Sequence, residues 1–205
     1  FFFPAEIENI LSNCDALCLE IENVSEQSID PTSLFDSNKQ LEDFCTPSQW
    51  DSIVSWAEHD LLMSKENFES NFKNAKPFLL MQFMLQNTLP LAHKSHEEEL
   101  EKLAARFNLK SLGFETIDEQ LSIFNNVDYS TQIDLLMSQL RELDKSKAEF
   151  NTMETIYNTQ DLDSLCAYTE SDIMNVMREE LLVNRNLKWV SKITPFMNKQ
   201  SVFFA

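Results

Sequence analysis

Apolar residues recur along most of this chain at the three- and four-residue spacing of an amphipathic helix. The segment 46–49 (TPSQ) is a capping box with proline at its second position, and such a box starts a helix by satisfying free backbone N–H groups. The apolar residues behind it fall on one helix face: Trp50, Ile53, Val54 and Ala57. Similar boxes begin at Ser95 and Thr116. The pattern predicts a mostly helical chain.

Further helices are predicted at both ends of the sequence. Pro4 followed by apolar residues at helical spacing indicates a short opening helix. Later helices are predicted over roughly 131–143, 146–157, 172–184 and 186–197. Residues 25–44 are polar and rich in turn-forming residues, which indicates a loop or linker.

Three short apolar runs interrupt the helical pattern, at 16–19 (ALCL), 109–114 (LKSLGF) and 202–205 (VFFA). Each follows a helical segment, as the buried strands of a parallel sheet do. We therefore predict a helix-rich α/β fold with a small parallel sheet; a purely helical scaffold is the alternative. We expect residues 1–205 to form a single domain, with a core at 1–24 and 109–205 and a helical insertion at 25–108.

Composition excludes several classes of function. The chain has one glycine in 205 residues, so it contains neither a glycine-rich phosphate loop nor a dinucleotide fingerprint. Its net charge is −18 and it has no cluster of Lys and Arg, which argues against a nucleic-acid partner. The most apolar stretch, 78–85, is far shorter than the roughly 20 residues of a transmembrane helix, and the first residues do not resemble a signal peptide.

Carboxylates follow two of the predicted strands. Glu20, with Glu22 nearby, comes after the first strand, and Glu115 comes after the second. Ligands of open parallel sheets bind beyond the carboxyl ends of the strands, so we expect these side chains in one crevice. Glu20 is the leading candidate, because a carboxylate that ends an apolar strand needs a cation or a metal to stay ionised. The alternative is an ordinary strand end that reaches solvent.

Other polar residues are weaker candidates. Arg185, beside Asn186 at a helix junction, has a forked guanidinium that suits a carboxylate; the alternative is a surface ion pair. His93 and His96 have a spacing that zinc sites use. However, the glutamates 97–99 that follow are typical of a first helical turn, which attracts negative charge. The four cysteines lack metal-site spacing and fit reduced thiols or up to two disulfides. Phe and Met at helical spacing predict core, with a partner groove as the alternative.

Several segments together resemble, in order, the motifs of the TraB/GumN/Tiki family of metalloproteases. The opening helix at 3–7 (FPAEI) and the strand at 15–20 (DALCLE) resemble the family's first elements. Further matches are the segments 76–78 (KPF) and 112–116 (LGFET) with Gln120, the stretch Tyr157, Asp161 and Leu165, and the helix motif Arg185-Asn186 with Trp189. Within the stretch that contains Tyr157, Asp161 and Leu165, Gln160 stands where the family has glycine.

This resemblance implies a metal-dependent hydrolase that acts on a peptide or protein. It implies that Glu20 is a metal ligand or general base, that Arg185 is its electrostatic partner, and that the metal is divalent (Mn, Co or Zn). Four further residues become candidates for the crevice: Glu22, Glu115, Gln120 and Asn186. It also suggests an extracytoplasmic or membrane-associated location. The expected chemistry is attack of a metal-bound water on a carbonyl group.

The sequence departs from the family in one important respect. The family has two Gly-x-x-His motifs, which would fall before Phe1 and after Ala205, and this sequence contains neither. We therefore expect a fragment or truncated member that is inactive as given, and whether it holds a metal by itself stays open. The alternative is a non-catalytic protein-binding scaffold of the same fold.

Overall fold

The computed structural model describes residues 4–21, 29–88, 95–168, 179–198 and 201–205. The chain divides into two compact units. Unit 1 comprises residues 1–29, 92–120 and 160–205, and unit 2 comprises residues 30–91 and 121–159. The expectation of one domain with a core and an insertion stays a prediction.

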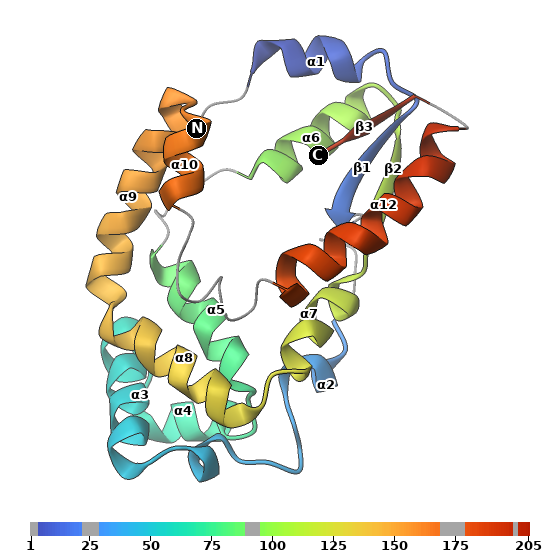
Figure 1. Ribbon diagram of the computed structural model, residues 1–205. Helices are drawn as coiled ribbons and strands as arrows, with labels where there is room; N and C mark the ends of the chain where they lie inside the picture. Colours follow the sequence, from blue (N-terminus) through green and yellow to red (C-terminus); the bar gives the residue numbers. More distant parts are fainter. Residues whose placement is uncertain (1–3, 22–28, 89–94, 169–178, 199–200) are drawn as a thin grey trace. The chain divides into compact units, whose positions relative to one another are not determined.

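Unit 1 contains the three-stranded sheet (Figure 1). Its strands are β1 (Ala16–Ile21), β2 (Lys110–Glu115) and β3 (Val202–Phe204). Its helical segments are α1 (Ala5–Leu11), α6 (His96–Arg106), α10 (Leu162–Tyr168), the π-helical turn η3 (Glu179–Val183) and α12 (Asn184–Met197). Helix α7 (Ile117–Asn125) begins in unit 1 and ends in unit 2.

The three strands form one parallel sheet in the order β2-β1-β3, which confirms the predicted α/β fold and rules out a purely helical scaffold. Strand β1 is longer than the sequence suggested. It continues to Ile21, which pairs with Glu115, so both Glu20 and Glu115 lie within strands rather than after them. The predicted strands stop before the carboxylates because charged residues break the apolar runs, whereas backbone pairing extends β1 past Glu20 and β2 as far as Glu115.

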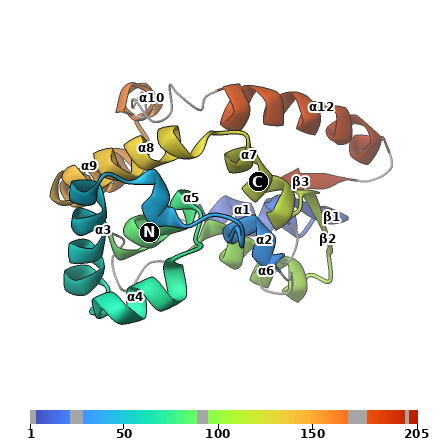
Figure 2. The same cartoon turned by 90° about the horizontal axis from the view of Figure 1, so that it is seen from below.

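The two faces of β1 have different surroundings. Leu17 and Leu19 pack with Leu11 of α1 and with Leu100 and Ala104 of α6 to form the apolar core of unit 1. The alternate residues of β1 point to the opposite face of the sheet. Figures 1 and 2 agree that α6 and α12 lie on opposite sides of the sheet. The face of β1 that contains Glu20 is therefore the face beneath α12.

Unit 2 is helical. It contains α2 (Pro31–Leu34), the 3-10 helix η2 (Leu41–Phe44), α3 (Pro47–Asp60), α4 (Lys65–Phe72), α5 (Pro77–Thr88), α8 (Tyr129–Arg141) and α9 (Leu143–Thr159). Its core is apolar and includes Phe68, Ile53, Leu80, Met84 and Leu136, all fully buried. The segment 25–44 was expected to be a loop, but the described part of it contains α2 and η2. Both are too short to show a helical period in the sequence.

The predicted helix starts are confirmed. Thr46 and Gln49 form a reciprocal capping box at α3, and Thr116 and Glu119 form another at α7. Ser95 accepts a hydrogen bond from the Glu98 backbone at α6. The helix predicted over 172–184 lies mostly outside the described residues.

Several smaller features bear on the sequence interpretation. Gln160 stands at the position where the resemblance leads us to expect glycine, and its φ is 58°, a left-handed conformation that glycine adopts most readily. Among the described residues no disulfide joins any of the four cysteines, and Cys18 is buried. Within the described residues, no helix is long and apolar enough to cross a membrane.

Candidate functional site

One arginine holds two strand-end carboxylates together on the α12 side of the sheet. Arg185 donates to Glu115 from Nε, at 3.2 and 3.1 Å to the two carboxylate oxygens, and from Nη2 at 2.9 Å. The same Nη2 donates to Oε2 of Glu20 at 2.7 Å. The structure therefore brings together three of the residues that the sequence singled out.

The fold explains why these residues meet. Glu20 and Glu115 lie on neighbouring strands near their carboxyl ends. Arg185 is in the first turn of α12, and Gln120 is near the start of α7, directly after β2. Gln120 donates from Nε2 to Oε2 of Glu20 at 3.1 Å. The parallel pairing of β1 and β2 thus gathers side chains that are far apart in the sequence.

The charges in this cluster are largely withdrawn from solvent. The side chains of Glu115 and Arg185 are 9% and 11% exposed, whereas that of Glu20 is 37% exposed. Burial alone would lower the pKa of Arg185, but its hydrogen bonds to Glu115 and Glu20 outweigh burial and raise that pKa. Two carboxylates and one guanidinium leave one net negative charge, which favours a cation near Glu20.

The two oxygens of Glu20 have different environments. Oε2 accepts both hydrogen bonds, from Arg185 and from Gln120. Oε1 has no hydrogen-bond partner among the described residues. Because the side chain is also partly exposed, one carboxylate oxygen is held in place while the other is available to a ligand or a proton.

Trp189 was quoted from the sequence only as part of a motif, yet it contacts the cluster directly. Its Nε1 donates to Oε1 of Glu115 at 2.9 Å, and its ring centroid lies 4.7 Å from the Arg185 guanidinium carbon. The ring stacks on Phe114 at 5.2 Å, and Phe114 in turn stacks on Phe204 at 5.9 Å. The signal for this role was the four-residue spacing of Arg185 and Trp189, which puts them on one helix face.

Glu97 is a second residue that the sequence analysis set aside. Partial burial of its carboxyl, followed by repulsion from Glu20 and Glu101, raises its pKa. The interpretation of glutamates 97–99 as a solvated helix start is correct for the capping geometry. That interpretation did not include the repulsion between Glu97 and Glu20, because only the packing of α6 against β1 brings the two carboxylates near each other.

Not every sequence candidate joins the cluster. Asn186 is exposed and has no side-chain hydrogen bond to a described residue. Glu22 and His93 lie outside the described residues. His96 begins α6, and no group of three His, Cys, Asp or Glu side chains within the described part of the chain is placed to hold a metal ion.

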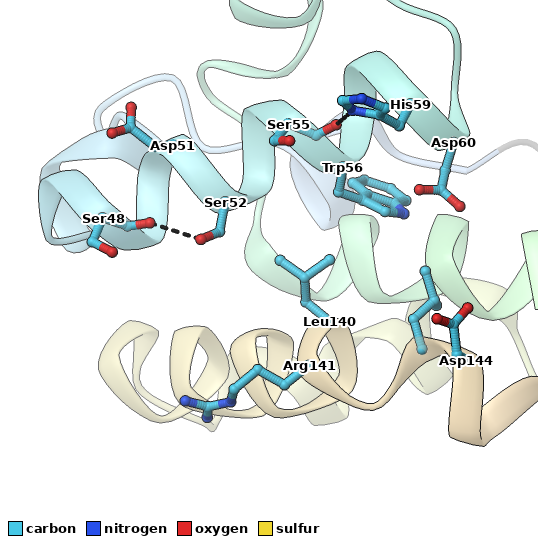
Figure 3. Close-up of a pocket in the computed structure, with 11 residues that line it drawn as sticks. Ser48, Asp51, Ser52, Ser55, Trp56, His59, Asp60, Leu140, Arg141 and Asp144 are labelled. Carbon is cyan, nitrogen blue, oxygen red and sulfur yellow. Dashed lines mark hydrogen bonds between the residues drawn. The ribbon is translucent and has the colours of Figure 1, made fainter.

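A surface pocket lies elsewhere, in unit 2 (Figure 3). It has a volume of about 700 Å³ and lies between α3 and the junction of α8 and α9. Trp56, His59, Asp60, Arg141 and Asp144 are among its lining residues. His59 Nδ1 donates to the Ser55 carbonyl at 2.7 Å. None of the residues singled out around Glu20 lines this pocket.

The fold and the cluster define a helix-rich α/β protein with a small parallel sheet and a shared arginine at the strand ends. A model of the TraB/PrgY/gumN family matches residues 1–205, so the chain belongs to that family. No curated protein and no solved structure matches the chain.

Proposed function

We propose that Glu20 is the reactive carboxylate of a metal-dependent hydrolase that acts on a peptide or protein. The observation that supports this proposal is the asymmetric environment of its carboxylate. Arg185 and Gln120 hold Oε2, whereas Oε1 has no partner among the described residues and the side chain is 37% exposed. A metal ligand or general base needs such an oxygen, fixed in direction and open on one side.

The described residues do not by themselves fit a complete metal centre. A catalytic transition-metal site takes about three protein ligands, and Glu20 is the only strong candidate ligand in the cluster, since Glu115 is committed to Arg185 and Trp189. On this proposal Glu20 contributes one ligand, and the two Gly-x-x-His motifs implied by the resemblance contribute the others. This chain as given is then inactive.

In this proposal Arg185 keeps the role that the resemblance implies, that of an electrostatic partner of Glu20, and it is not assigned the role of an oxyanion donor. A guanidinium that stabilises an oxyanion must have donors free to reach it. Here Nε and Nη2 are engaged with two carboxylates and the side chain is 11% exposed. Arg185 therefore acts as the electrostatic partner that orients the carboxylate of Glu20.

The second candidate function is a non-catalytic protein-binding scaffold. One observation favours it: Leu187, Val190 and Met197 of α12 are 66%, 61% and 64% exposed. Their spacing puts them on one face of the helix, away from the face that carries Arg185 and Trp189. Exposed apolar stripes of this kind are found at protein interfaces.

The test is the metal content of the natural protein, including any sequence that flanks residues 1–205. We expect stoichiometric Mn, Co or Zn in the wild type and less than about a tenth of it in Glu20→Gln, because an amide is a poor metal ligand. Glu6→Gln, on the exposed face of α1, is the matched control and should retain the metal. Circular dichroism checks that each variant folds.

Two results would contradict the proposal. If Glu20→Gln retains the metal, the carboxylate is not a ligand. If the natural wild type holds no metal and hydrolyses no peptide, the scaffold alternative gains support instead.

A further inference from the structure

Trp189 has an interaction that a purely apolar role would not require. Its ring already packs on Phe114 at 5.2 Å and lies over the Arg185 guanidinium at 4.7 Å. A phenylalanine could make both contacts. The indole N–H adds a 2.9 Å hydrogen bond to Oε1 of Glu115, which a phenylalanine could not make.

Glu115 connects Trp189 to Arg185. Its Oε1 accepts from Trp189 Nε1 and from Arg185 Nε, and its Oε2 accepts from both Nε and Nη2 of Arg185. With a side chain only 9% exposed, it has little access to water that could replace these donors. The carboxylate is therefore fixed in rotation, and the fork geometry fixes the guanidinium plane in turn.

The position of the Arg185 guanidinium determines which oxygen of Glu20 is hydrogen-bonded and which is left open. Nη2 is shared between Glu115 Oε2 at 2.9 Å and Glu20 Oε2 at 2.7 Å. If the guanidinium rotated, Arg185 could fork onto both oxygens of Glu20, and Oε1 would no longer be open. The bonds to Glu115 prevent this, because they use Nε and Nη2 together.

We propose that Trp189 and Glu115 are positioning residues of the Glu20 site: they fix Arg185 so that it holds one carboxylate oxygen of Glu20 and leaves the other free. Only the use made of that free oxygen rests on the proposed function. The positioning itself is a property of the folded chain.

A purely structural role is a weaker explanation of this arrangement. Buried ion pairs are often no more stabilising than apolar residues of similar size. The stack of Trp189 on Phe114 would persist without any charge beneath it. The hydrogen-bonded carboxylate is therefore better explained as a device for orientation than as a source of stability.

The experiment removes the indole N–H and follows the arginine. In Trp189→Phe the ring contacts remain, and we expect hydrogen exchange at Arg185 Nε–H, measured by nitrogen-15 NMR on the full chain, to become faster by about tenfold as its acceptor gains freedom. The matched control is Trp56→Phe. Trp56 is 4% exposed and its Nε1 has no hydrogen-bond partner among the described residues, so this variant should leave Arg185 unchanged.

A second variant covers the case in which Trp189→Phe does not fold. Glu115→Gln keeps an oxygen for the indole but removes the charge that holds the guanidinium, and it should also speed exchange at Arg185. The inference is overturned if the folded variants stay within about twofold of the wild-type exchange rate, since loss of a charge-assisted bond should exceed that. It is equally overturned if Trp56→Phe has the same effect as Trp189→Phe.

The metal content of the natural protein distinguishes this inference from the proposed function. An absent metal would remove the hydrolase proposal but would leave the Arg185 exchange result intact. A metal that persists beside an unaltered Arg185 in Trp189→Phe would remove the positioning role alone.

Discussion

The two units of this protein satisfy their buried groups in opposite ways. Unit 2 encloses a large apolar core in which the only buried polar residue among those described is Gln132. That amide is well bonded: it donates to the carbonyls of Phe124 and Val127 and accepts from the Phe78 backbone. Unit 1 has a small apolar core on one face of its sheet and a charged, hydrogen-bonded layer on the other.

The difference indicates which buried groups serve a purpose other than stability. Gln132 caps backbone groups at helix ends, so its bonds complete secondary structure. Arg185 instead donates to the side chains of Glu20 and Glu115. Removing charges from water is unfavourable. A charged layer at the strand ends of a parallel sheet, where ligands bind in such sheets, is therefore a candidate functional site.

The largest effect should come from the apolar core of unit 2. Phe68 is fully buried, stacks against Phe72 at 5.4 Å and makes a tilted ring contact with Trp50 at 5.8 Å. We expect Phe68→Ala to lower the free energy of unfolding by about 3–5 kcal/mol, because it loses buried area and leaves a cavity. Urea unfolding measures this. Leu85→Ala, at a side chain 49% exposed, should cost less than about 1 kcal/mol; equal losses would contradict the assignment of the core.

The charged layer of unit 1 should respond differently to loss of one partner and of two. Arg185→Met leaves Glu115 buried without a cation, and we expect it to cost about 2 kcal/mol, less than the ~3–5 kcal/mol of a fully buried pair, since Glu20 is partly exposed.

Adding Glu115→Gln to Arg185→Met should restore part of this loss, because the amide keeps an acceptor for Trp189 without an unpaired charge. Urea unfolding of the two single variants and the double variant gives the coupling free energy. If the two losses simply add, the layer behaves like the apolar core and the comparison between the units fails.

The smallest effect should depend on pH. Partial burial and repulsion from Glu20 and Glu101 raise the pKa of Glu97 in the folded protein. The folded state therefore binds this proton more readily than the unfolded chain, so ionisation of Glu97 opposes folding. The cost is absent below the ordinary glutamate pKa of about 4.3 and fully present above the raised value.

Glu97→Gln should thus raise the free energy of unfolding slightly at pH 7, by less than about 1 kcal/mol, and should have no such benefit near pH 4. Unfolding curves at the two pH values check this. Glu98→Gln removes a neighbouring exposed charge from the same helix turn and should be neutral or slightly destabilising at pH 7. A gain in that control as large as in Glu97→Gln would show that the field of Glu20 is not the cause.

Much of the site was predictable because its members lie at element boundaries. The apolar runs at 16–19 and 109–114 predicted the two strands, and the carboxylates beside them pointed to one edge of a sheet. Arg185 was found through its forked guanidinium at a helix junction. The sequence pattern did not predict which side chain pairs with which. An arginine in a surface ion pair and a buried arginine shared by two carboxylates look the same in the sequence.

The sequence alone predicted the helix starts at Thr46 and Thr116 and the three strands of a parallel sheet. Capping and periodicity act over a few residues, so local sequence was sufficient for these elements. Only the tertiary structure decided that Arg185 bridges Glu20 and Glu115, that Trp189 holds Glu115, and that one oxygen of Glu20 is left open. These contacts join residues up to 165 positions apart. They depend on how α12 packs across the sheet, and no local pattern encodes that packing.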